Sequence, residues 1–146
     1  MVTSAYRALI AILLFVFFAH ADTEKLLLPD GKVQIFKKIE SSRPMLRSIT
    51  KADHNLTSVY IDQKNGERVA TRGEIVLYMQ KEPDWQDLQA RFPVLFEREV
   101  AKGIYLVKNL SQKSDIVLCN EINKYIKNGK AVPNWIRSRR IQTLKR

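Results

Sequence analysis

From residue 74 onward, apolar runs of strand length alternate with apolar residues at helical spacing. Residues 74–80, EIVLYMQ, form a nearly continuous apolar run, which is typical of a strand at the centre of a sheet. Trp85, Leu88 and Phe92 then recur at spacings of three and four, so they share one face of a helix. The Pro-Asp pair just before Trp85 suits the first turn of that helix. The pattern therefore predicts a strand followed by a short helix.

The same pattern continues toward the C-terminus. Residues 94–101 and 104–109 read as two strands joined by a tight turn at Lys102-Gly103. A second helix follows, with Ser114 available as N-cap and Gly129 as the C-terminal stop. Its apolar face would consist of Ile116, Cys119, Ile122 and Ile126, which we expect to be buried against Val76, Leu106 and their neighbours.

A last extended stretch, 132–136, completes the order strand, helix, strand, strand, helix, strand. This order predicts an α+β fold: a ferredoxin-like βαββαβ antiparallel sheet with two helices on one face, over residues 74–139. In that topology the second and fourth strands lie outermost. Here they carry the charged run 97–99 and Pro133, which an edge strand tolerates.

The segment before this domain divides into two parts. Residues 58–73 form a predicted β-hairpin that turns at Asn65-Gly66, because both turn residues accept positive φ. Residues 22–57 read as an N-terminal arm, with a short strand at 32–36 and no apolar core of its own.

The first 21 residues have the features of a secretory signal peptide. Arg7 is followed by 11 apolar residues, 8–18, and by the small-x-small sequence Ala19-His20-Ala21. A bilayer span needs roughly 20 apolar residues, so this run is too short for one. We therefore expect a secreted or periplasmic protein with no stable membrane anchor after signal cleavage. An uncleaved anchor is the alternative.

The charge balance limits the classes of partner. The chain has 25 Lys and Arg against 15 Asp and Glu, a net charge of +10, which falls to +9 when Arg7 leaves with the signal peptide. Such an excess favours anionic envelope or polymer surfaces and acidic proteins, whereas we expect no nucleic-acid partner for an exported chain. The basic residues are scattered except in the tail, 140–146, so a merely solvated surface is the competing interpretation.

Few residues could support catalysis or bind a cofactor or metal. Cys119 is the only cysteine, which excludes an intrachain disulfide, and its apolar neighbours predict a buried, inert thiol. His54 is the only histidine after signal cleavage and lies in a polar segment with no nucleophile-elbow motif nearby. We therefore predict a protein that is not an enzyme and has no cofactor.

Residues 58–139, about half of the chain, resemble the N-terminal propeptide of subtilisin-like serine proteases, the inhibitor I9-like domain. The resemblance lies in the first strand, GEIVL, the third strand, GIYLV, and the final AVPNW, together with a helix that ends near glycine. The hairpin of residues 58–73 is similar to one that precedes this domain in longer members of the family.

The resemblance implies binding to a subtilisin-like serine protease. Such propeptides pack the open face of their sheet against the protease, and the chain that leaves the fourth strand runs through the active-site cleft. They assist folding of the protease and inhibit it. The protease-binding residues implied here are Val132, Pro133, Asn134, Trp135, Ile136, Arg137, Ser138 and Arg139.

Several alternatives remain open. Because no catalytic Asp, His and Ser blocks follow in this sequence, the chain could be a free-standing inhibitor or chaperone, a remnant of a truncated gene, or a relative that binds something else. The main functional alternative is a secreted basic module for anionic envelope or polymer surfaces. Trp135 could equally face the core of the domain, with the basic tail solvated.

Overall fold

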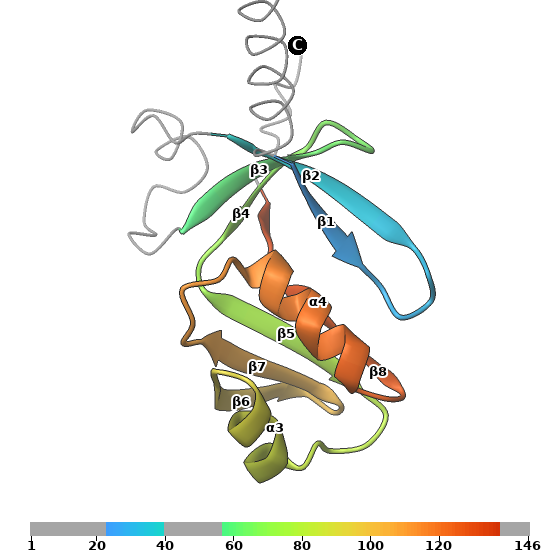
Figure 1. The fold of residues 1–146 in the computed structure, drawn as a ribbon, viewed down its shortest axis with the longest axis vertical. Helices are drawn as coiled ribbons and strands as arrows, with labels where there is room; N and C mark the ends of the chain where they lie inside the picture. Colours follow the sequence, from blue (N-terminus) through green and yellow to red (C-terminus); the bar gives the residue numbers. More distant parts are fainter. Residues whose placement is uncertain (1–22, 40–56, 138–146) are drawn as a thin grey trace, which may run out of the picture.

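The computed structural model describes residues 23–39 and 57–137. The predicted signal peptide, His54 and the basic tail lie outside these ranges. The described residues form two antiparallel sheets and two helices, so the predicted α+β class with antiparallel sheets is confirmed (Figure 1).

The first sheet has five strands in the order β1-β2-β3-β4-β9, each antiparallel to its neighbours. The predicted hairpin is present as β3 and β4, and Gly66 in its turn has φ 69°. The strands are β1 (Thr23–Leu27), β2 (Val33–Ile39), β3 (Ser58–Asp62), β4 (Arg68–Thr71) and β9 (Ile136–Arg137).

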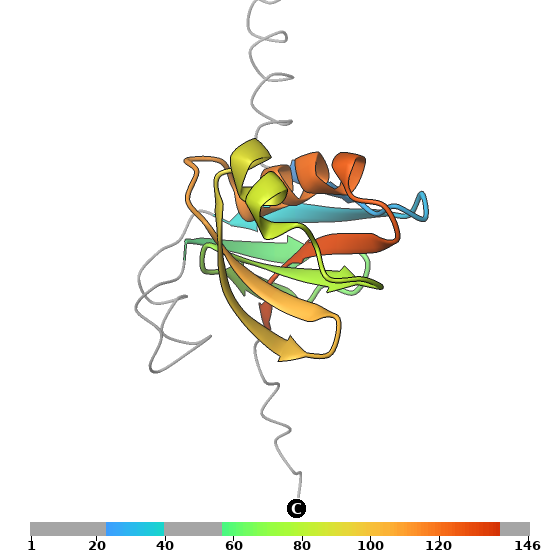
Figure 2. The same cartoon turned by 90° about the horizontal axis from the view of Figure 1, so that it is seen from below.

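The second sheet has four antiparallel strands in the order β6-β7-β5-β8. Both helices lie on the same face of this sheet, above its strands in Figure 2. The strands are β5 (Glu74–Met79), β6 (Val94–Ala101), β7 (Ile104–Asn109) and β8 (Gly129–Pro133), and the helices are α3 (Trp85–Arg91) and α4 (Asp115–Tyr125).

Both helices begin at side chains that cap them. Asp84 accepts a hydrogen bond from the backbone N–H of Asp87 (3.1 Å), and Ser114 accepts one from that of Val117 (3.2 Å), which confirms the predicted N-cap. The predicted stop at Gly129 is wrong. Helix α4 ends at Tyr125, since Ile126 already has an extended backbone and the following chain must reverse into β8.

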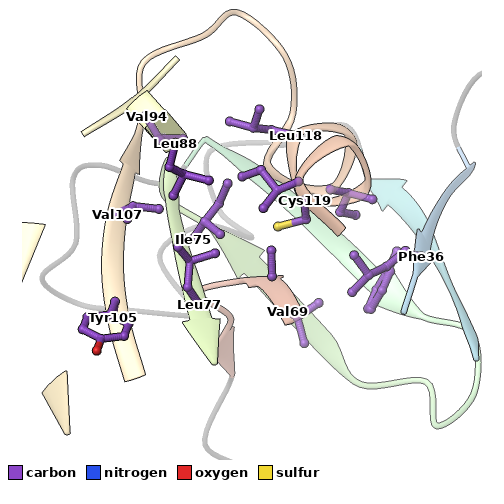
Figure 3. Close-up of a cluster of buried hydrophobic side chains, with 14 of the residues drawn as sticks. Phe36, Val69, Ile75, Leu77, Leu88, Val94, Tyr105, Val107, Leu118 and Cys119 are labelled. Carbon is purple, nitrogen blue, oxygen red and sulfur yellow. The ribbon is translucent and has the colours of Figure 1, made fainter. Parts of the chain in front are cut away.

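The core lies between the helices and the two sheets (Figure 3). Ile116, Cys119 and Ile122 are buried as predicted, whereas Ile126 is only partly buried because it follows the last turn of α4. The prediction that Val76 and Leu106 pack against this helix face is wrong, since the two are paired in the register and lie on the same side of the sheet. Strand alternation instead points Ile75 and Leu77 toward the helices, and Val76 lies on the opposite face.

The predicted N-terminal arm contributes to this same core. Leu26 in β1 is 0% exposed and Phe36 in β2 is 2% exposed, and both belong to the main buried cluster. The outer edge of β1 is held by Asn120 of α4: its Oδ1 accepts from the N–H of Leu27 (2.8 Å) and its Nδ2 donates to the carbonyl of Lys25 (2.7 Å). The first hairpin is thus packed against α4 rather than extended as a separate arm.

Candidate functional site

The predicted protease-binding segment does not form one continuous edge strand. Val132 and Pro133 end β8, the chain then crosses between the two sheets, and Ile136 and Arg137 form β9 beside β4. The predicted strand 132–136 is therefore wrong in its extent. Ser138 and Arg139 lie outside the described residues.

The crossing between the sheets is held by Glu74. The N–H of Asn134 donates to the backbone carbonyl of Glu74 (2.9 Å), and its Nδ2 donates to the carboxylate Oε2 (2.7 Å). Arg72 Nε donates to the same oxygen at 2.8 Å. Pro133, just before the crossing, pairs with Ile75 and has a fully buried side chain. These residues are fixed in the fold rather than presented to a partner.

Trp135 packs inside the molecule. Its ring centroid lies 4.5 Å from that of Phe36 and 5.9 Å from that of Tyr60, which it meets edge-on. Tyr60 in turn donates its hydroxyl hydrogen to Glu24 (2.6 Å), and burial, followed by this hydrogen bond, raises the pKa of Tyr60. Of the two interpretations of Trp135, the one that places it against the core agrees with these contacts.

The last two described residues also belong to the fold. Ile136 and Arg137 pair with Ala70 and Val69, and the Arg137 guanidinium forms an ion pair with Glu67. Of the implied protease-binding residues, only Ser138 and Arg139 follow the last described strand.

The outer edge of β8 is occupied as well. Asn123 on α4 accepts a hydrogen bond from the N–H of Ala131 (2.6 Å) and donates to its carbonyl (2.9 Å) and to that of Leu27 (3.1 Å). A side-chain amide thus replaces a neighbouring strand here. A partner chain cannot add to this edge by strand pairing without displacing Asn123.

The face of the second sheet opposite the helices has an apolar centre. The strand register places Leu106, Val76 and Val132 side by side across β7, β5 and β8. Leu95 of β6 and Tyr78 of β5 flank this row and are 48% and 40% exposed. Phe96 confirms the orientation of β6, since its ring packs on Trp85 of α3 and so leaves Leu95 on the other side. We call this surface the open face.

Charged side chains surround the apolar centre of the open face. Lys108 lies opposite Leu95 in the register, Arg98 opposite Leu106, and Lys130 opposite Tyr78, with its Nζ 5.1 Å from the centroid of that ring. The carboxylate of Glu74 is already bonded to Arg72 and Asn134. Apolar side chains within a basic rim are a composition that suits a partner with an apolar patch and acidic neighbours.

One polar cluster was not predicted from the sequence. Asp115, at the start of α4, is only 3% exposed and borders a polar cavity of about 320 Å³. Its carboxylate accepts from Asn109 Nδ2 (2.8 Å) and from the N–H of Gly73 (3.0 Å). Burial raises its pKa, and these hydrogen bonds oppose that rise. Both carboxylate oxygens therefore have a donor. These hydrogen bonds join the start of α4 to β7 and to the residue just before β5.

The single cysteine lies in the core. Cys119 is fully buried, and burial raises the pKa of its thiol well above the usual range, which suits the predicted inert role. In the part of the chain that the structure describes, no group of three or more His, Cys, Asp or Glu side chains could hold a metal ion. Within residues 23–39 and 57–137, no helix is long and apolar enough to cross a membrane.

Comparison with known proteins adds no relative. No protein-family model matches the chain, and neither a curated protein nor a solved structure does.

Proposed function

We propose that this chain is an exported, non-catalytic protein that binds a subtilisin-like serine protease through the open face and through the segment that follows β9. Binding would inhibit the protease or assist its folding. The observation that carries the proposal is the asymmetry of the second sheet. Both helices cover one face, while the other has the buried Leu106, the partly exposed Val76 and Val132, and the exposed Leu95 and Tyr78 beside them.

The order of strands and helices supports a propeptide-like, ferredoxin-like arrangement for this part of the chain. From β5 to β8 the elements follow as strand, helix, strand, strand, helix, strand, and the first of these strands lies between the third and the fourth in the sheet. This order leaves one face free of helices, which is the feature that a docking role requires.

We infer separate roles for the open face and for the residues after β9. In Figure 2, β9 points away from the helices, toward the side of the open face. The nine residues 138–146 follow it, and when extended they span at most about 30 Å. In the proposed mechanism the open face supplies the docking area and residues 138–146 enter the protease cleft. Residues 132–137 position this segment.

Inhibition assays on the mature chain, residues 22–146, test this proposal. We expect inhibition of at least one subtilisin-type protease. Changing Tyr78 and Leu95 together to Asp should weaken binding at least tenfold, because it places two charges against an apolar contact. Removing residues 138–146 should abolish inhibition and leave measurable binding.

The matched control for the double change is Val117→Asp. Val117 lies on α4, is 38% exposed and faces away from the open face, so its replacement should leave inhibition unchanged. Absence of inhibition across several subtilisin-type proteases, in a chain that unfolds cooperatively, would contradict the proposal.

The basic rim favours one second candidate, a binding module for anionic envelope or polymer surfaces. Arg98, Lys108 and Lys130 all lie on the open face. This function predicts binding to an anionic polymer that falls steeply with salt, because exposed charges are screened within about 8 Å at physiological ionic strength. Changing these three residues to Glu would abolish such binding, whereas protease docking through the apolar centre would persist in weakened form.

A further inference from the structure

A cavity of about 530 Å³ lies at one end of the molecule, where four chain reversals meet. They are the β1–β2 turn, the end of β5, the β6–β7 turn and the α4–β8 turn, all on the right of Figure 2. Such a volume lies within the range of about 300–1,000 Å³ that small-molecule sites occupy. The side chains that matter for its chemistry are Leu28, Tyr78, Met79, Lys102, Ile104 and Lys130.

Backbone contacts fix the walls of this cavity. The N–H of Met79 donates to the carbonyl of Gly103 (2.8 Å), and that of Gln80 donates to the carbonyl of Asn128 (3.2 Å). Gly103 and Asn128 have φ values of 76° and 56°, so both turns hold left-handed residues. A Cβ on Gly103 would lie 2.6 Å from the Met79 carbonyl oxygen, which shows how closely the backbones approach. The cavity is therefore preformed.

The cavity combines apolar walls with a basic mouth. Leu28, Met79 and Ile104 supply apolar surface. Lys102 and Lys130 line the same cavity, and neither forms an ion pair with another described residue. The acidic residue there, Asp30, is already paired with the Lys32 side chain (3.1 Å) and accepts a hydrogen bond from its N–H (3.0 Å).

We propose that this cavity binds an organic anion with an apolar body, such as a medium-chain alkyl carboxylate. The alkyl chain would lie between Leu28, Met79 and Ile104, and the carboxylate between the ammonium groups of Lys102 and Lys130. Binding at this site requires no protease, although Tyr78 and Lys130 belong to both the cavity and the open face.

Titration of the mature chain with decanoate, followed by amide chemical shifts in NMR spectra, tests the proposal. Decanol, which has no charge, and decyltrimethylammonium, which has the opposite charge, serve as comparison ligands. We expect saturable shifts at the amides of Gly103 and Gly129, with decanoate binding more tightly than either comparison ligand. Lys102→Glu replaces one exposed charge attraction with a repulsion of similar size, each worth about 0.2–1 kcal/mol, so it should weaken decanoate binding roughly two- to thirtyfold.

Lys64→Glu is the matched control, because Lys64 lies in the exposed β3–β4 turn and does not line the cavity. It should leave the affinity for decanoate unchanged. Ile104→Trp, which adds bulk to the apolar wall, should weaken decanoate and decanol alike. The proposal is overturned if decanoate causes no saturable shifts at Gly103 and Gly129 up to about 1 mM. It is also overturned if all three ligands bind with equal affinity, or if Lys102→Glu and Lys64→Glu lose the same affinity for decanoate.

Discussion

Replacing Asn123 with Ala should destabilise the fold more than its partial exposure suggests. The side chain forms one hydrogen bond with the N–H of Ala131, one with its carbonyl and one with the carbonyl of Leu27. Each contributes about 1 kcal/mol net, so their loss costs roughly 3 kcal/mol. Alanine is the better helix former by about 0.5 kcal/mol, which leaves an expected loss of about 2.5 kcal/mol.

Urea unfolding, followed by the fluorescence of Trp85 and Trp135, measures this loss. Amide hydrogen exchange adds a local test, because the N–H of Ala131 loses its acceptor and should lose protection. The control is Lys124→Ala, on the same helix and exposed, which should change stability by less than about 0.5 kcal/mol. An Asn123→Ala loss no larger than this control, with the Ala131 amide still protected, would show that water replaces the amide and would refute the reasoning.

The remaining predictions concern Trp135, two glycines and Asp115. Trp135→Ala should lower the free energy of unfolding by about 3–5 kcal/mol in urea titrations, because the ring packs on Phe36; a variant of normal stability would contradict that packing. Gly103→Ala should lower the free energy of unfolding by about 1–3 kcal/mol more than Gly66→Ala does, because both glycines have positive φ but only Gly103 lies against a carbonyl. Equal unfolding midpoints for the two variants would argue against this contact. Burial raises the pKa of Asp115 above 3.8, so its contribution to stability is greatest below that pH and declines as pH rises through the folded pKa. Between pH 3 and pH 7, the urea midpoint of the wild type should therefore exceed that of Asp115→Asn by the largest margin at the acidic end. A margin that grows with pH would show that the pKa of Asp115 is lowered in the folded state.

The local elements were predictable because their signals are local. The spacing of apolar residues predicted α3 and α4, Ser114 predicted a cap, and Asn65-Gly66 predicted the turn between β3 and β4. Each of these depends on residues within a few positions of one another, where periodicity and turn chemistry decide the backbone.

The sequence alone did not determine which side of a strand faces the core. In β5 the run EIVLYM is almost continuously apolar, so it contains no alternation that would separate Ile75 and Leu77 from Val76. Packing against the helices made that choice. The composition of the open face followed from it.

The path of the last strand was also decided by tertiary structure. Nothing between Val132 and Arg137 indicates a change of sheet. The change occurs because β4 has a free edge that accepts Ile136 and Arg137, Glu74 binds Asn134 at the crossing, and Trp135 finds an aromatic surface on Phe36. Asn134 and Glu74, for example, are 60 positions apart along the chain. Only the folded chain brings them together, and there the predicted strand 132–136 is divided between the end of β8 and the start of β9.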